Sequence, residues 1–133
     1  MQGSDFNSHI DFIGDIHAGY DHLIWLMEKL GWQKKNNGFF HPENRHLCFL
    51  GDFINIGNQN LKTIHLIRRL CDEGKALCLC GNHEFELYRY WLQHLDFYRK
   101  KILSAEMEFY LPFLKETGSE TRFTEIMLWI GNL

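Results

Sequence analysis

Short apolar runs of strand length alternate with helical patterns along most of the chain. Three such runs lead into a glycine turn, at residues 9–15, 46–50 and 76–80. Residues 20–30 and 61–72 separate them and repeat apolar side chains at the spacing of a helix with one buried face. Strand, glycine turn and helix in repeated order predict a parallel α/β sheet. We expect each glycine turn at the carboxyl end of its strand, the edge where open α/β sheets bind ligands.

The remaining segments carry weaker signals. An Asn-Asn-Gly sequence at residues 36–38 predicts a small hairpin. Residues 85–108 are rich in aromatic side chains and mostly helical in pattern, and residues 123–130 form a short amphipathic stretch. Since no repeat, low-complexity segment or linker interrupts the sequence, we interpret residues 1–133 as a single domain.

Composition and charge exclude several classes of protein. The chain has 133 residues, 45% of them hydrophobic, and a formal net charge of -3, so it lacks the basic surface of a nucleic-acid binder. Residues 1–9 are polar and do not resemble a signal peptide. No apolar run reaches the roughly 20 residues of a membrane helix. We therefore expect a soluble, cytoplasmic protein that binds neither nucleic acid nor membrane.

The four cysteines fit a core role better than a metal site. Cys78 and Cys80 are separated by one residue, which is not the C-x-x-C spacing of zinc sites, and no second pair exists. Cys48 lies in another strand-like run, and Cys71 ends a helical one. We expect all four to be buried free thiols.

Metal-ligand side chains follow each of the three strands. Asp15 and His17 come after the first strand, Asp52 after the second and Asn82 after the third. In extended backbone, side chains two residues apart share a face, so Asp15 and His17 could reach one ion. Asp52 could bridge two ions, and Asn82 could bind the second. Any one of these residues alone is more often a turn or helix cap, but three such loops in order favour a metal site.

A two-metal site of this kind suits phosphoryl chemistry. Carboxylate and amide oxygens suit Mn or Mg, and imidazole nitrogen extends the range to Fe and Zn. Two ions polarise a phosphoryl oxygen and lower the pKa of a bridging water. His83 lies beside a ligand without being needed as one, so it suits the general acid that protonates the leaving oxygen.

The three loops resemble the motifs of the calcineurin-like metallophosphoesterase superfamily. The relevant sequences are Gly-Asp-Ile-His at residues 14–17, Gly-Asp at 51–52 and Gly-Asn-His-Glu at 81–84. The last is similar to the branch that contains serine/threonine phosphoprotein phosphatases and bacterial diadenosine-tetraphosphatase-like proteins. The resemblance covers residues 10–87 and, more weakly, residues 123–133.

The resemblance implies a role for each matching residue. Asp15 and His17 would bind the first metal, Asp52 would bridge both, and Asn82 would bind the second. His83 would be the catalytic acid, and the reaction would be hydrolysis of a phosphate ester or anhydride by direct attack of water. The implied cofactors are two divalent ions, with Mn expected and Fe, Zn or Mg as alternatives. The implied substrate is a phosphorylated small molecule or a phosphoprotein.

Several positions depart from the family pattern. Asn55 replaces an aspartate that orients the acid histidine, and Ile56 replaces an arginine that grips phosphate. Ala18 replaces a glycine that often follows the first histidine. The family takes two further histidine ligands from later loops, whereas His94 is the only histidine after His83 in this sequence.

Two readings therefore remain open from the sequence. The chain is an active two-metal phosphoesterase, or it is a truncated or degenerate relative with impaired metal binding and little activity that serves as a binding or partner subunit. The expected fold is the N-terminal part of a four-layer α/β/β/α sandwich, truncated at its C-terminus, with the second sheet largely missing. Such a fold would expose one apolar sheet face, which predicts a homo-oligomer formed through that face.

Overall fold

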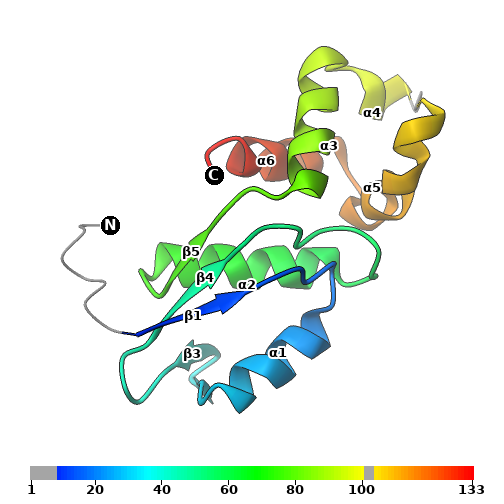
Figure 1. Ribbon diagram of the computed structural model, residues 1–133. Helices are drawn as coiled ribbons and strands as arrows, with labels where there is room; N and C mark the ends of the chain where they lie inside the picture. The colour runs from blue at the N-terminus through cyan, green and yellow to red at the C-terminus, as the bar shows by residue number, and fades with distance from the viewer. Residues whose placement is uncertain (1–8, 101–103) are drawn as a thin grey trace.

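Three parallel strands form the central sheet in the order β1–β4–β5 (Figure 1). The computed structural model describes residues 9–100 and 104–133. The strands are β1 (Ile10–Ile13), β4 (His46–Phe49) and β5 (Ala76–Cys78). The sequence prediction of an α/β fold with a mostly parallel sheet flanked by helices is confirmed.

Both crossover helices cover the same face of this sheet. Helix α1 (Tyr20–Lys29) connects β1 to β4, and helix α2 (Asn60–Asp72) connects β4 to β5. Each crossover adds its strand in the same direction, and right-handed crossovers then place both helices on one side. The core between the sheet and these helices includes Ile13, Leu47, Phe49, Leu23, Met27, Ile64 and Ile67.

The opposite face of the sheet, here called the bare sheet face, is exposed on its two outer strands, β1 and β5. Phe12, Cys48 and Leu77 stand in one row across the three strands. The Phe12 and Leu77 residues are 67% and 44% exposed, and Leu79 after β5 is 50% exposed. Only the central strand β4 is buried on both faces, since Leu47, Cys48 and Phe49 are all buried. The apolar face expected from the sequence is present.

Among the described residues, the only other sheet is a two-stranded antiparallel hairpin. It joins β2 (Gln33–Lys35) to β3 (Gly38–Phe40). Its two turn residues, Asn36 and Asn37, have φ values of 51° and 63°. Positive φ at both central positions matches the twist of paired strands, and asparagine tolerates it better than most residues. The hairpin predicted from the sequence is confirmed.

The C-terminal part is helical but not continuous. Helix α3 ends at Gln93, well before the end of the helical pattern predicted over residues 85–108. The chain turns there because Phe97 is buried against Phe123, with ring centroids 5.5 Å apart. The elements of this part are α3 (Asn82–Gln93), α4 (Phe97–Lys100), the 3-10 helix η1 (Ala105–Tyr110), α5 (Leu111–Thr117) and α6 (Glu120–Ile130).

The structure also bears on the predictions for the cysteines and for the start of the chain. All four cysteines are free, but only Cys48 is buried as expected, while Cys71 and Cys78 are half-buried. The expectation is wrong for Cys80, which is exposed because β5 ends at Cys78. The prediction for the polar start falls on residues 1–8, which lie outside the described residues. Within the described part of the chain, no helix combines the length and apolar character needed to cross a membrane.

Candidate functional site

The loops after β1, β4 and β5 meet at the carboxyl edge of the sheet. The backbone N–H groups of Ile16 and His17 both donate to the carbonyl oxygen of Asp52, at 3.1 and 3.0 Å. Gly81 lies directly against Asp52, because a Cβ on Gly81 would stand 2.2 Å from the Asp52 nitrogen. Only glycine allows this approach. The parallel order of the strands therefore brings the three loops into contact.

The side chains of Asp15 and His17 lie together. The His17 Nε2 atom is 3.4 Å from the Asp15 Oδ2 atom, and the two side chains are 25% and 64% exposed. The backbone that achieves this is not the extended one expected from the sequence. His17 and Ala18 have φ values of 46° and 56°, a left-handed turn that the hydrogen bond from the Gly57 N–H to the His17 carbonyl helps to hold.

Asp52 also sits in a left-handed turn and is partly committed to the third loop. Its φ is 52°, directly after Gly51 at 96°. Its Oδ1 atom accepts a hydrogen bond of 2.9 Å from the backbone N–H of His83. A carboxylate oxygen has two lone pairs, so Oδ1 keeps acceptor capacity. Within the described residues nothing donates to the Asp52 Oδ2 atom.

Glu84 holds the second and third loops together from inside. It is fully buried, and its Oε1 atom accepts from the N–H groups of Asp52 and Gly81 at 2.6 and 3.1 Å. Its Oε2 atom accepts from the Ile54 N–H at 3.4 Å. Burial raises the pKa of this carboxyl to about 7, although the backbone hydrogen bonds oppose the shift.

Sequence reasoning gave Glu84 no role. A signal was present, because an acid three residues after Gly81 at the start of α3 has the spacing of a capping box. That pattern explains the contact between Glu84 and Gly81. The contacts to Asp52 and Ile54 depend on the packing of β4 beside β5, which no local pattern reveals.

The ring of His83 lies among other rings. Its centroid is 4.9 Å from that of His17, 5.6 Å from Phe109 and 6.3 Å from Tyr110. The Tyr110 hydroxyl donates to Glu86 at 2.6 Å, and burial raises the pKa of this tyrosine so that it stays protonated. Phe109 and Tyr110 come from η1 and have no motif, so sequence reasoning missed them. Together they cover one side of the candidate acid.

The Asn55–Ile56 turn stands at the positions where the family has aspartate and arginine. Asn55 is 2% exposed and has a φ of 73°, while Ile56 is 66% exposed and has a φ of 70°. The Asn55 backbone N–H donates to Asn60 Oδ1 at 2.7 Å. Its side-chain Nδ2 atom and the His83 Nδ1 atom are both buried without a hydrogen-bond partner among the described residues. The structure therefore gives His83 no hydrogen bond from Asn55.

The candidate ligands have the donor chemistry of a divalent-cation site, but their described positions do not enclose an ion. Asp15, His17 and Asp52 offer the oxygen and nitrogen ligands that such ions take. Asn82 is exposed at the first position of α3. Within residues 9–100 and 104–133, however, no three side chains of the His, Cys, Asp or Glu type are close enough to enclose an ion. A second ion would have only Asp52 and Asn82 from the described chain.

Comparison with known proteins identifies a family whose matched range includes all three loops. Residues 8–128 match the calcineurin-like phosphoesterase family. An asymmetrical bis(5'-nucleosyl)-tetraphosphatase PrpE from Halalkalibacterium halodurans is 39% identical over 82 residues, which are 62% of this chain and 33% of that protein. The PrpE of Oceanobacillus iheyensis is 40% identical over 82 residues, again 62% and 33% of the two chains. That of Bacillus subtilis is 38% identical over 80 residues, 60% of this chain and 33% of its own. The chain spans about one third of the length of the curated relatives it matches.

Proposed function

This chain belongs to the calcineurin-like phosphoesterase family, and from that premise we propose that its three loops form a metal-dependent site that hydrolyses phosphate esters or anhydrides. One observation carries the proposal. The backbone of the first loop donates to the carbonyl oxygen of Asp52, and the backbone N–H of His83 donates to its carboxylate, so three loops with ligand side chains converge on one residue. Convergence of this kind at the carboxyl edge of a parallel sheet is typical of a catalytic site.

Each site residue then has a role that its surroundings support. Asp15 and His17 would hold one ion between them, Asp52 would bridge to a second, and Asn82 would supply the second with an amide oxygen. Divalent ions bound there, with Mn as our choice, would activate a water molecule and stabilise charge on the phosphoryl oxygens. His83 would protonate the leaving oxygen. The neighbouring rings of Phe109 and Tyr110 would keep bulk water from one side of His83.

For the substrate we propose a small phosphorylated molecule. The relatives with 38–40% identity are named for the cleavage of bis(5'-nucleosyl) tetraphosphates. A dinucleoside polyphosphate is therefore the first substrate to test, with a phosphoprotein as the alternative. Ile56 supports a substrate grip that differs from the family's, because an exposed aliphatic side chain cannot bind phosphate as arginine does.

A second candidate function rests on the same site. Asn55 Nδ2 is buried without a partner, Ile56 provides no charge, and the described residues enclose no ion with three His, Cys, Asp or Glu ligands. These observations favour a degenerate relative with weak metal binding and little turnover, which would act as a binding or partner subunit.

Hydrolysis assays separate the two readings. We would measure turnover of p-nitrophenyl phosphate and diadenosine tetraphosphate with and without Mn²⁺. The enzyme reading expects Mn-dependent turnover that Asp52→Asn lowers by about a hundredfold or more, as loss of a bridging ligand should. Asp72→Asn, an exposed position at the end of α2, is the matched control and should keep full activity. Wild-type turnover no higher than the protein-free blank would favour the degenerate relative.

We also propose self-association through the bare sheet face. The support is the run of exposed apolar side chains at Phe12, Leu77 and Leu79. Light scattering should show a dimer or larger particle, and Leu77→Lys should shift it toward the monomer. A wild-type protein that scatters as a monomer at all concentrations would end this proposal.

A further inference from the structure

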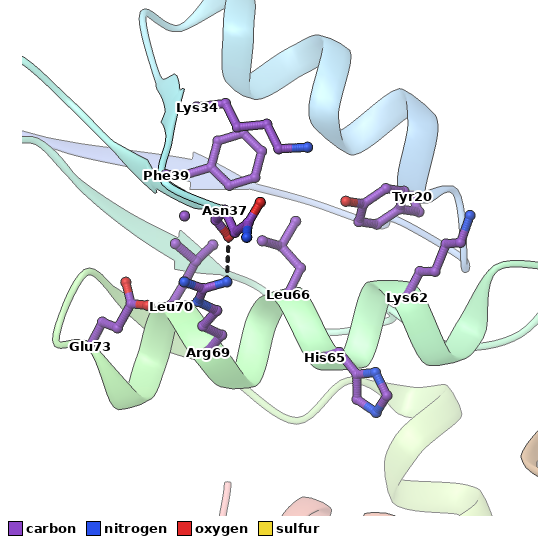
Figure 2. Close-up of a pocket in the computed structure, with 11 residues that line it drawn as sticks. Tyr20, Lys34, Asn37, Phe39, Lys62, His65, Leu66, Arg69, Leu70 and Glu73 are labelled. Carbon is purple, nitrogen blue, oxygen red and sulfur yellow. Dashed lines mark hydrogen bonds and ion pairs between the residues drawn. The ribbon is translucent and has the colours of Figure 1, made fainter.

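A pocket separate from the loop cluster lies where α1, α2 and the β2–β3 hairpin meet (Figure 2). Its volume is about 370 Å³, which is within the range of small-molecule pockets. None of the candidate metal ligands lines it. The residues that matter for its chemistry are Tyr20, Lys34, Phe39, Lys62, Leu66 and Arg69.

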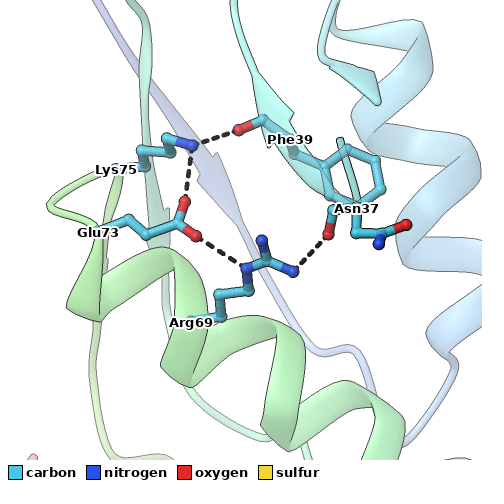
Figure 3. A network of polar contacts seen from close by, with 5 residues as sticks. All are labelled: Asn37, Phe39, Arg69, Glu73 and Lys75. Carbon is cyan, nitrogen blue, oxygen red and sulfur yellow. Dashed lines mark hydrogen bonds and ion pairs between the residues drawn. The ribbon is translucent and has the colours of Figure 1, made fainter. Parts of the chain in front are cut away.

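One wall of this pocket is fastened by a polar network (Figure 3). Arg69 Nε donates to Glu73 at 2.8 Å, and Arg69 Nη1 donates to the carbonyl oxygen of Asn37 in the hairpin turn. Lys75 donates to Glu73 and to the Phe39 carbonyl, both at 2.6 Å. The hydrogen bonds from Lys75 and Arg69 lower the pKa of Glu73, so its charge is compensated by its own neighbours. The network joins α2 to the hairpin and gives the pocket a fixed shape.

Two other cationic side chains at the pocket, Lys34 and Lys62, take no part in this network. Lys34 and Lys62 form no ion pair and no hydrogen bond with any of the described residues. The Lys34 side chain extends above Phe39 toward Tyr20, and the Lys62 ammonium lies beside Tyr20, 5.8 Å from the centre of its ring (Figure 2). Both therefore remain available to an external anion.

The local charge is opposite in sign to that of the whole chain. Lys34, Lys62 and Arg69 against Glu73 give the lining a formal charge of +2, counting histidine as neutral, while the chain carries -3. A concentration of positive charge in a concave site attracts anions from solution. Because Lys34 and Lys62 come from different elements, the charge is focused by the fold and not by a basic run in the sequence.

The floor of the pocket is apolar. Phe39 and Leu66 are 5% and 8% exposed, and the half-buried Tyr20 forms one side. Of these three residues, Tyr20 keeps the most open surface. An inorganic anion would leave its ring uncovered, whereas a molecule with an apolar body would bury it. Charge and shape together select a small organic anion.

We propose that this pocket binds a small phosphate monoester with an aromatic body. The phosphate group lies between Lys34 and Lys62, and the body lies against Tyr20 and Phe39. The site is separate from the proposed hydrolytic site, and its occupancy does not depend on that function.

Phenylphosphonate is the probe that tests this pocket. It carries an anionic head and an aromatic body, and its carbon–phosphorus bond is not a substrate for ester hydrolysis. Amide NMR shifts of the full chain would be followed in EDTA, which keeps metal out of the loop cluster. We expect saturable shifts at Tyr20, Gly38 and Lys62. Inorganic phosphate should bind about fivefold or more weakly because it lacks the body.

Charge-matched variants then decide which residues bind the probe. The double variant Lys34→Gln with Lys62→Gln should lose affinity about tenfold or more, because two charge-assisted contacts disappear. The control double variant Lys35→Gln with Lys115→Gln removes the same charge. Lys35 follows Lys34 in β2, with its ammonium over Phe40 instead, and Lys115 lies on α5. The control should change the affinity less than about twofold.

Three results would overturn the proposal. The first is an equal loss of affinity in both double variants, which would indicate only long-range charge. The second is a set of shifts centred on Asp15 and His83, which would place the probe at the loop cluster. The third is no shift in the wild type at about 20 mM probe, far above the affinity expected of a built site. Circular dichroism of each variant confirms that a lost shift is not a lost fold.

Discussion

The candidate site contains two regions whose side chains support the surrounding backbone to very different degrees. The Asp52–Glu84 junction consists of Gly51, Asp52, Gly81, His83 and Glu84. Glu84 accepts from three backbone N–H groups, and Asp52 Oδ1 accepts from a fourth. All four N–H groups belong to the loops after β4 and β5, which carry candidate ligands. The junction is therefore fixed before any ion binds.

The Asn55–Ile56 turn shows the opposite. Its backbone is held by Asn60, which Glu116 of α5 in turn holds through three hydrogen bonds to the start of α2. This support holds the backbone of the turn, but none of these hydrogen bonds reaches the side chains of Asn55 or Ile56. Asn55 Nδ2 has no partner among the described residues, and Ile56 is a β-branched, exposed residue with a φ of 70°. Such a backbone is unfavourable for isoleucine.

The Asp52–Glu84 junction maintains the shape of the candidate site, whereas the Asn55–Ile56 turn occupies the positions that would contact a substrate. The junction would position the proposed ligands, and the residues that resemble the family motifs lie there. The turn holds Asn55 and Ile56, two of the positions where this chain departs from the family pattern. This contrast supports the proposal that the loop framework of the family is kept while the positions that would contact substrate have changed.

The largest expected effect is the loss of the glycine at the junction. Gly81→Ala would place a Cβ 2.2 Å from the Asp52 nitrogen and 2.5 Å from its Oδ1 atom. We expect a loss of about 4 kcal/mol or more in the free energy of unfolding, which urea denaturation would measure. Gly14→Ala is the control, because nothing lies within 4 Å of its Cβ. If the two variants were equally stable, the close packing of the loops would be wrong.

Removal of the buried carboxylate should come next. Glu84→Ala leaves the N–H groups of Asp52, Gly81 and Ile54 without their acceptor and opens a cavity. We expect a loss of about 3 kcal/mol in stability at pH 5. Glu28→Ala, at an exposed position of α1, should change stability by less than about 0.5 kcal/mol. A cost for Glu84→Ala no greater than this would mean that water replaces the carboxylate freely.

The raised pKa of Glu84 predicts a pH dependence of stability. The folded state keeps the proton up to about pH 7, whereas the unfolded chain releases it near the ordinary value of 4.5. Between these values the folded state binds more protons, so stability falls as pH rises, by about 2–3 kcal/mol from this group. Glu84→Gln removes the titration. In EDTA, the stability of wild type relative to Glu84→Gln should fall from pH 4.5 to 7.5, and parallel pH profiles would refute the assignment.

The smallest effect concerns the turn. Ile56→Asn replaces a β-branched residue with one that tolerates positive φ, at an exposed position. We expect a gain of about 0.5–1 kcal/mol in stability, measured by thermal or urea unfolding. Ile56→Val keeps the branch and should give no gain. Equal stabilities of the asparagine and valine variants would show that the turn is not strained.

The sequence predicted those parts of this molecule that depend on local pattern. The apolar runs before Gly14, Gly51 and Gly81 located the three strands of the central sheet, and the Asn36–Gly38 signal located the hairpin. The proximity of Asp15 and His17 was expected for the wrong reason, since a left-handed turn and not extended backbone creates it.

Local sequence patterns did not predict the contacts between segments that lie far apart in the chain. Glu84 meets Ile54 from thirty positions along the chain, and Phe109 covers His83 from η1. Neither contact leaves a periodicity or a motif in the sequence. The exposed Cys80 illustrates the same limit, because only the pairing of β5 with β4 decides where the strand stops.

Direct measurement of Mn²⁺ binding tests the central claim, that the three loops form a metal site. Electron paramagnetic resonance of free Mn²⁺ would give the number of ions per chain and their affinity. We expect at least one ion per chain in the wild type, with affinity reduced about tenfold or more by Asp15→Asn and by Asp52→Asn. Asp72→Asn should not change it. No Mn²⁺ bound at about 1 mM, or binding unaffected by Asp52→Asn, would contradict the account.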